Sequence, residues 1–140
     1  MQLERVTEAA TKAGGSNHHF RFIQLPVNLM MPEALSRVNQ TISGSQMTIL
    51  EAAEALRICA IASASLLQAR LARGMPDTLR QAIPGLVDDA ARALQFVRSA
   101  PGVSVALVGM SQTEHVRRNL ELAHIEPMTG HQFDVFFGHR

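Results

Sequence analysis

The sequence contains no tyrosine, no tryptophan and only one cysteine among its 140 residues. A lone Cys59 cannot form an internal disulfide bond or a cysteine-rich metal site. All aromatic packing depends on six Phe residues, and the chain has no phenol that could act as a general acid. These absences exclude a disulfide scaffold and any chemistry that needs a Tyr from this chain.

Net charge and long apolar runs are lacking as well. The chain has 13 basic and 12 acidic residues, and its arginines are scattered from Arg5 to Arg140, so charge gives no attraction to nucleic acid or anionic lipid. The most apolar stretch, Ile58 to Leu67, is shorter than the ~18 residues of a membrane span. The N-terminus lacks the apolar core of a signal peptide. We expect one cytoplasmic domain that binds neither nucleic acid nor a membrane.

Helix-like and strand-like patterns alternate along the first half of the chain. Leu3 to Ala13 has apolar residues at helical spacing. Phe20 to Leu29 is rich in aromatic and branched residues and predicts a strand, in which Pro26 should lie where pairing ends. The polar stretch Pro32 to Gln46 predicts a loop, with a turn of helix at Glu33 to Val38.

The next elements are a helix and a buried strand. Thr48-x-x-Glu51 is a capping box that opens the helix. The apolar run Ile58 to Ala62 follows it and is typical of a parallel strand buried on both faces. Cys59 lies inside this run, which favours a packed thiol over a reactive one.

Two further elements and a last helix complete the pattern. Leu86 to Val97 predicts a helix with Val87 on its buried face, and Val103 to Val108 predicts a strand. Ser111-x-x-Glu114 is a second capping box, opening a helix with three inward-facing residues, Val116, Leu120 and Ala123. Helices and strands in alternation predict an α/β fold with three parallel strands and about four helices.

Four segments, in this order, resemble the C-terminal part of the aldo/keto reductases. They are FIQLPVNL from Phe22, IASASLL from Ile61, ALQFVRSAPGV from Ala93 and ALVGMSQTEHVRRNL from Ala106. They look like that family's sixth strand, the end of its seventh, the helix before its eighth, and its eighth strand with the following helix. The resemblance covers residues 1–125 and implies strands six to eight of a partial TIM (β/α) barrel. Because a whole barrel takes roughly 250 residues, we expect a truncated chain.

The same resemblance implies that catalytic residues are missing. The family's tetrad of Asp, Tyr, Lys and His follows the earlier barrel strands. This sequence has no Tyr, and its only Lys is Lys12 in the first helix. We therefore expect no catalytic residue in this chain and no carbonyl reduction by the chain alone.

Part of an NADP site is implied by the resemblance. Gln24 corresponds to the residue that binds the nicotinamide amide, and Ser63 replaces the aromatic side chain that stacks on its ring. His115 stands where an Arg often grips the 2'-phosphate, so the grip should be weak. Asn119 keeps the adenine-facing amide. The other implied contacts surround the pyrophosphate and the strand-to-helix turn that suits a phosphate: Leu66, Gly109, Met110, Ser111 and Gln112.

Simpler readings remain open for several of these residues. Ser111 can be only the cap of its helix. Gln24 and Asn28 can simply satisfy backbone groups where strand pairing ends. The adjacent rings of His18 and His19 point to opposite faces in extended chain, so no metal site is expected there or elsewhere.

The last segment, residues 126–140, is a Phe-rich tail that the resemblance does not cover. Its stretch from Gln132 to Phe137 (QFDVFF) predicts a fourth strand per chain. Two chains would then supply eight strands, so we expect a homodimer with the tail at its interface. Uncovered strand edges also invite pairing.

Three functions stay open, in order of preference. The first is an inactive aldo/keto-reductase-like fragment that assembles as a homo-oligomer. The second is one half of a split NADP-dependent oxidoreductase, whose other chain supplies the missing barrel half. The third is a weak NADP-binding module.

Overall fold

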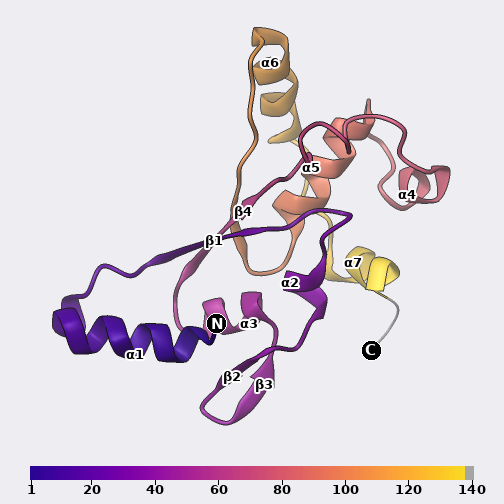
Figure 1. The fold of residues 1–140 in the computed structure, drawn as a ribbon. Coiled ribbons are helices and arrows are strands. Elements are labelled where there is room, and N and C mark those ends of the chain that lie inside the picture. Colours follow the sequence, from indigo (N-terminus) through magenta and orange to yellow (C-terminus); the bar gives the residue numbers. More distant parts are fainter. Residues whose placement is uncertain (138–140) are drawn as a thin grey trace.

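The computed structural model describes residues 1–137, except for the side chains of residues 134 and 135 (Figure 1). Three parallel strands form its main sheet: β1 (Phe22–Pro26), β4 (Cys59–Ser63) and β5 (Val103–Ala106). The strand order is β1-β4-β5. The predicted α/β fold with three parallel strands is therefore confirmed, and Pro26 ends its strand as expected.

Helices separate and follow these strands. Within the described residues no helix is long and apolar enough to cross a membrane. The antiparallel hairpin of β2 (Gln40–Ile42) and β3 (Ser45–Met47) lies almost wholly in the stretch Pro32 to Gln46, for which the sequence predicted a loop. The helical elements are α1 (Leu3–Gly14), the 3-10 turn η1 (Gly15–Asn17), α2 (Glu33–Ser36), α3 (Ile49–Ala55), α4 (Asp77–Ala82), α5 (Asp89–Ser99), α6 (Thr113–Leu122) and α7 (Gly130–Phe137).

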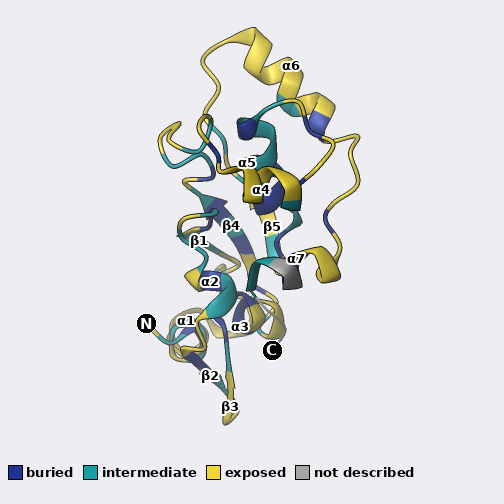
Figure 2. Cartoon of the chain, turned by 90° about the vertical axis from the view of Figure 1, so that its right-hand side faces the viewer, coloured by how far each residue is buried: buried dark blue, intermediate teal, exposed yellow. Residues whose placement is uncertain are grey.

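The two faces of the main sheet differ in burial (Figure 2). Ala60 and Ala62 point toward the helices and are fully buried, with α3 contacting β4 and α5 packing on β5. On the opposite face, Phe22 lies beside Cys59, and the side chain of Phe22 is 61% exposed and that of Val105 46% exposed. We call this face, lined by Phe22, Gln24, Cys59, Ile61, Ser63 and Val105, the open face.

The open face corrects two predictions. The run Ile58 to Ala62 is buried on one face only, and Cys59 is exposed rather than packed. The physical reason is that no element of the described chain lies over this side of the sheet. The exposed apolar side chains of the open face leave a surface that another polypeptide could cover.

The capping prediction is confirmed at one helix and wrong at another. At α3, the Thr48 hydroxyl accepts a hydrogen bond from the Glu51 amide, and the Glu51 carboxylate accepts one from the Thr48 amide. At α6, the N-cap is Gln112, and no side chain caps the helix. The helix begins one residue later than the box requires, so Ser111 lies before the N-cap, and the Glu114 carboxylate binds Arg117 and Arg118 instead.

Two predicted apolar faces are also wrong. Val116 and Leu120 on α6 are exposed, as is its C-cap residue Ala123, and Leu122 is the buried residue of that helix. Val87 is exposed because α5 begins only at Asp89, after the N-cap Asp88. Figure 1 shows α6 extending away from the sheet, so it has little core to face.

The tail forms a helix instead of the predicted strand. In α7, Phe133 and Phe136 pack on Phe96 of α5, with ring centroids 5.1 and 5.4 Å away. Phe133 is buried in the main core. Residues three and four apart share one helix face, so Phe133, Phe136 and Phe137 together suit a helix. The argument for an eight-stranded homodimer built on the tail is therefore lost, because the tail binds its own chain.

A buried carboxylate ties α5 to the segment before it. Asp89 accepts hydrogen bonds from the Met75 amide (3.0 Å) and from two nitrogens of Arg80 (2.9 and 3.0 Å). These bonds, the one from Arg80 first, lower the pKa of Asp89 from 3.8 to about 2. A carboxylate with a lowered pKa stabilises the fold above its unfolded-state pKa, and this contribution is lost as the pH falls through the folded-state value.

We expect Asp89→Asn to lower the free energy of unfolding by about 2 kcal/mol at pH 7, because it removes bonds to a charged group. The difference between the variant and the unchanged chain should shrink as the pH falls from 4 to 2, as followed by urea unfolding at each pH. Asp77→Asn is the matched control: Asp77 also pairs with Arg80, at 3.1 Å, but its side chain is 84% exposed. Equal losses of unfolding free energy for Asp77→Asn and Asp89→Asn would contradict a stabilising role that depends on the burial of the Asp89 carboxylate.

Candidate functional site

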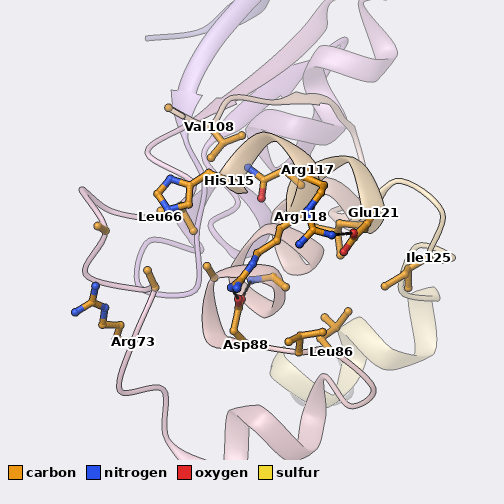
Figure 3. A pocket seen from close by; sticks show the side chains of 18 of the residues that line it. Leu66, Arg73, Leu86, Asp88, Val108, His115, Arg117, Arg118, Glu121 and Ile125 are labelled. Carbon is orange, nitrogen blue, oxygen red and sulfur yellow. Dashed lines mark hydrogen bonds and ion pairs between the residues drawn. The ribbon is translucent and has the colours of Figure 1, made fainter. Parts of the chain in front are cut away.

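A cavity of about 990 Å³ lies at the carboxyl ends of β4 and β5 (Figure 3). Its walls are α6, the start of α5 and the loop that follows β4. Leu66 comes from that loop, and Val108 comes from the segment after β5. The volume suits a ligand of nucleotide size, and barrels of this type place their binding sites at the carboxyl ends of strands.

The structure brings five of the nine predicted cofactor residues to this cavity. The five that line it are Leu66, Gly109, Ser111, His115 and Asn119. Met110 and Gln112 belong to the same turn before α6 but do not line the cavity. Gln24 and Ser63 lie elsewhere, on the open face. The predicted site is thus divided between a cavity and an uncovered sheet surface.

Polar groups at the α6 wall are available for a ligand. The side chains of Ser111, His115 and Asn119 form no hydrogen bond with another described residue. Since no side chain caps α6, the first amides of that helix also lack a side-chain acceptor. The simpler reading of Ser111 as a helix cap is therefore wrong. Free amides at a helix N-terminus favour an anion such as phosphate.

The arginines of α6 are already paired. Arg117 binds Glu114 at 2.7 Å and Glu121 at 2.6 Å, while Arg118 binds Glu114 at 2.9 Å. Hydrogen bonds from Arg117 and then Arg118 lower the pKa of Glu114 to about 2. Arg118 also reaches Asp88, the N-cap of α5, at 3.1 Å, which Figure 3 shows as a link across the cavity. Positive charge on α6 is largely neutralised.

The loop after β4 holds an unusual backbone conformation. Leu67, Gln68 and Ala69 have φ values of 45°, 53° and 65° in succession, and Ala64 has 55°. The left-handed region costs a residue other than Gly roughly 1–2 kcal/mol. Non-glycine residues keep such a conformation where the surroundings enforce it, and binding sites are a common place for it.

Two buried polar side chains fix this loop. The Ser65 hydroxyl, 1% exposed, donates to the Leu107 carbonyl at 2.7 Å, and the Asn28 amide donates to the Ala64 carbonyl at 3.0 Å. Asn28 therefore does satisfy a backbone group where strand pairing ends, as one reading predicted; Gln24 forms no such bond. Sequence reasoning missed Ser65, although a polar residue inside an apolar run is a visible signal.

Comparison with solved structures identifies the fold. The aldo-keto reductase AKR11C1 from Bacillus halodurans matches in its holo form (TM-score 0.64, 13% identity) and its apo form (0.62, 14%). The thermostable aldo-keto reductase Tm1743, in complex with the inhibitor epalrestat, matches with a TM-score of 0.63 and 17% identity. Each match covers 94% of this chain, and this chain spans 43–46% of those chains. No protein-family model and no curated protein matches the sequence.

Proposed function

We propose that this chain, which has the fold of part of an aldo-keto reductase, binds the adenosine-phosphate end of NADP and reduces no carbonyl by itself. The observation that carries the proposal is the cavity, because it gathers five residues that the family resemblance assigns to NADP. One structural neighbour was solved in a holo form, which is consistent with a cofactor site in this fold.

The cavity suits the adenosine end in particular. The uncapped N-terminus of α6 offers amides to a phosphate. Asn119 offers both a donor and an acceptor to an adenine edge. Leu66, Leu86 and Val108 supply apolar surface for the base and ribose. His115 lacks the planar guanidinium with which an Arg forms two parallel bonds to a phosphate, so binding is weak.

The nicotinamide end fits this chain poorly. Bound NADPH supplies a hydride from its nicotinamide ring. Ser63 cannot stack on that ring as an aromatic side chain would, and such stacking contributes about 0.5–1.5 kcal/mol to binding. Gln24 and Ser63 lie on the open face, where water competes for their polar groups. No Tyr is present, and Lys12 lies in α1. The chain therefore holds the cofactor without a proton donor for carbonyl reduction.

Titration of NADPH fluorescence tests this proposal. We expect saturation with a dissociation constant below about 1 mM, weakened several-fold by Asn119→Ala and unchanged by Thr11→Ala, a control in α1. Adding an aldehyde to the complex should leave the NADPH absorbance constant. No binding at this concentration, or equal effects of the two variants, would contradict nucleotide binding. Steady consumption of NADPH after the aldehyde is added would contradict the proposal that the chain alone reduces no carbonyl.

The open face supports a second function, association with another chain. Its exposed Phe22 and Val105, and the free outer edges of β1 and β5 among the described residues, are surfaces that proteins normally cover. We propose a homodimer formed through this face. The alternative partner is a separate chain that supplies the remaining barrel strands, which would make this chain half of a split NADP-dependent oxidoreductase.

A further inference from the structure

The main sheet is uncovered on its open face and at both of its outer edges. The strand order β1-β4-β5 leaves one edge of β1 and one edge of β5 without a neighbouring strand among the described residues. Parallel sheets in proteins are normally covered on both faces, and an unpaired edge is a surface on which further strands pair. A partner that completes this sheet must therefore contact the open face and both edges.

The free edge of β1 carries unused backbone groups. The Val27 amide donates to the Ser63 carbonyl at 3.2 Å, so Val27 and the other odd-numbered residues of this segment bond toward β4. Successive residues of a paired strand turn their backbone groups to opposite sides, so the amides of Phe22 and Gln24 face the free edge. Pro26 faces the same edge and has no amide. The edge can therefore pair at Phe22 and Gln24, and its pairing ends at Pro26.

The free edge of β5 offers a matching set of groups. The Leu107 amide donates to the Ala62 carbonyl at 2.9 Å, so the odd-numbered residues here bond toward β4. By the same alternation, the amides of Ser104 and Ala106 face outward. Because β1 and β5 run in the same direction, the free edge of β1 from one copy can pair in parallel with the free edge of β5 from a second copy.

Other pairings of two copies leave part of the sheet uncovered. Two β1 edges, or two β5 edges, would pair in antiparallel fashion about a two-fold axis and extend the sheet. Such a dimer would leave the open face exposed and one edge of each copy free. Pairing of β1 with β5 of the other copy, made twice by the symmetry, occupies both edges and turns the two open faces toward each other.

We propose that two copies of this chain form a ring of six parallel strands, in which β1 of each copy pairs with β5 of the other. The inference rests on the homodimer proposed above and states how it is built. Phe22, Ile61 and Val105 from both copies fill the interior, and no side chain of the open face carries a charge that would repel its copy. All six strands point the same way, so the cavities of the two copies lie at one end of the ring.

Thiol reactivity and hydrogen exchange test the ring on the unchanged chain. Cys59 is the sole cysteine and is exposed in the single chain, so its alkylation by a maleimide reports cover over the open face. We expect alkylation to slow about 10-fold or more between dilute and concentrated solution. Over the same range, the amides of Phe22 and Gln24 in β1 and of Ser104 and Ala106 in β5 should exchange about 10-fold more slowly.

A variant of the β5 edge gives a second test. Ser104→Pro removes an amide that faces outward in the single chain, so it should weaken association about 10-fold through one lost bond in each copy. Ser104→Ala is the matched control, because it changes the side chain and keeps the amide. Equal effects of the two variants on association would overturn edge pairing.

The outcomes separate the ring from the homodimer itself. Slower alkylation of Cys59 with unchanged exchange at the edges would overturn the ring and leave the homodimer standing. Slower exchange at one edge only would indicate an extended sheet and overturn the ring as well. A single-chain mass at every concentration would overturn the homodimer and this inference with it. Slower exchange at both edges together with slower alkylation would support both.

Discussion

Phe96→Ala is expected to lower the free energy of unfolding by about 3–5 kcal/mol. Phe96 is 1% exposed and is the largest fully buried side chain of the described chain. It packs on Phe133 and Phe136, so its removal leaves a cavity between α5 and α7 and takes away the contact that holds the tail. A loss of this size is a large part of the stability of a small domain.

Urea unfolding followed by circular dichroism measures this loss, and Phe22→Ala is its control. Phe22 is 61% exposed, so the same chemical change should cost less than about 1 kcal/mol. Phe133→Ala should reproduce much of the loss, and combining it with Phe96→Ala should cost less than the sum, because the two rings share one contact. Additive losses of unfolding free energy for Phe96→Ala and Phe133→Ala would contradict the packing of the tail on α5. An equal loss for Phe22→Ala would contradict the burial of Phe96 as the cause of its effect.

The order of helices and strands could be predicted because local patterns determine it. Helical spacing in α1 and the capping box at Thr48 survive in the structure, since both depend on neighbours within a few residues. The capping box predicted at Ser111 and Glu114 does not form in the structure. The helix starts at Thr113 with Gln112 as its N-cap, and a four-residue pattern does not determine which residue of a polar turn begins the helix.

Burial could not be predicted in the same way. The run Ile58 to Ala62 is apolar throughout, yet Cys59 is exposed because burial depends on what covers the sheet. The tail was ambiguous in its periodicity. Phe133 and Phe137 fit the two-residue period of a strand, while Phe133, Phe136 and Phe137 fit a helix face, and packing on Phe96 decides for the helix.

Only the part of the candidate site that lies within the segments resembling the family could be predicted from the sequence. The resemblance supplied residues near β5 and α6, and five of the nine implied residues share the cavity. The loop after β4 could not be predicted, because its sequence has neither a helical nor a strand period. Its shape depends on Ser65 reaching the Leu107 carbonyl, 42 residues away in sequence.

Association through the open face is the prediction with the largest expected effect on binding. Light scattering should give the purified chain a mass of two chains at high concentration. Phe22→Asp combined with Val105→Asp should weaken this association by about 100-fold or more, since each apolar side chain is worth about 1.5–3 kcal/mol when buried. Both positions are exposed in the single chain, so the substitutions should leave the fold intact.

Val38→Asp is the matched control, because Val38 is an exposed apolar residue outside the open face. It should not change the solution mass. A single-chain mass at every concentration, or an equal effect of Val38→Asp, would contradict the homodimer. Three strands from each of two copies make six, which differs from the eight of a closed barrel. A monomeric chain whose mass increases only when a polypeptide with the complementary strands is added would therefore favour the split-enzyme alternative.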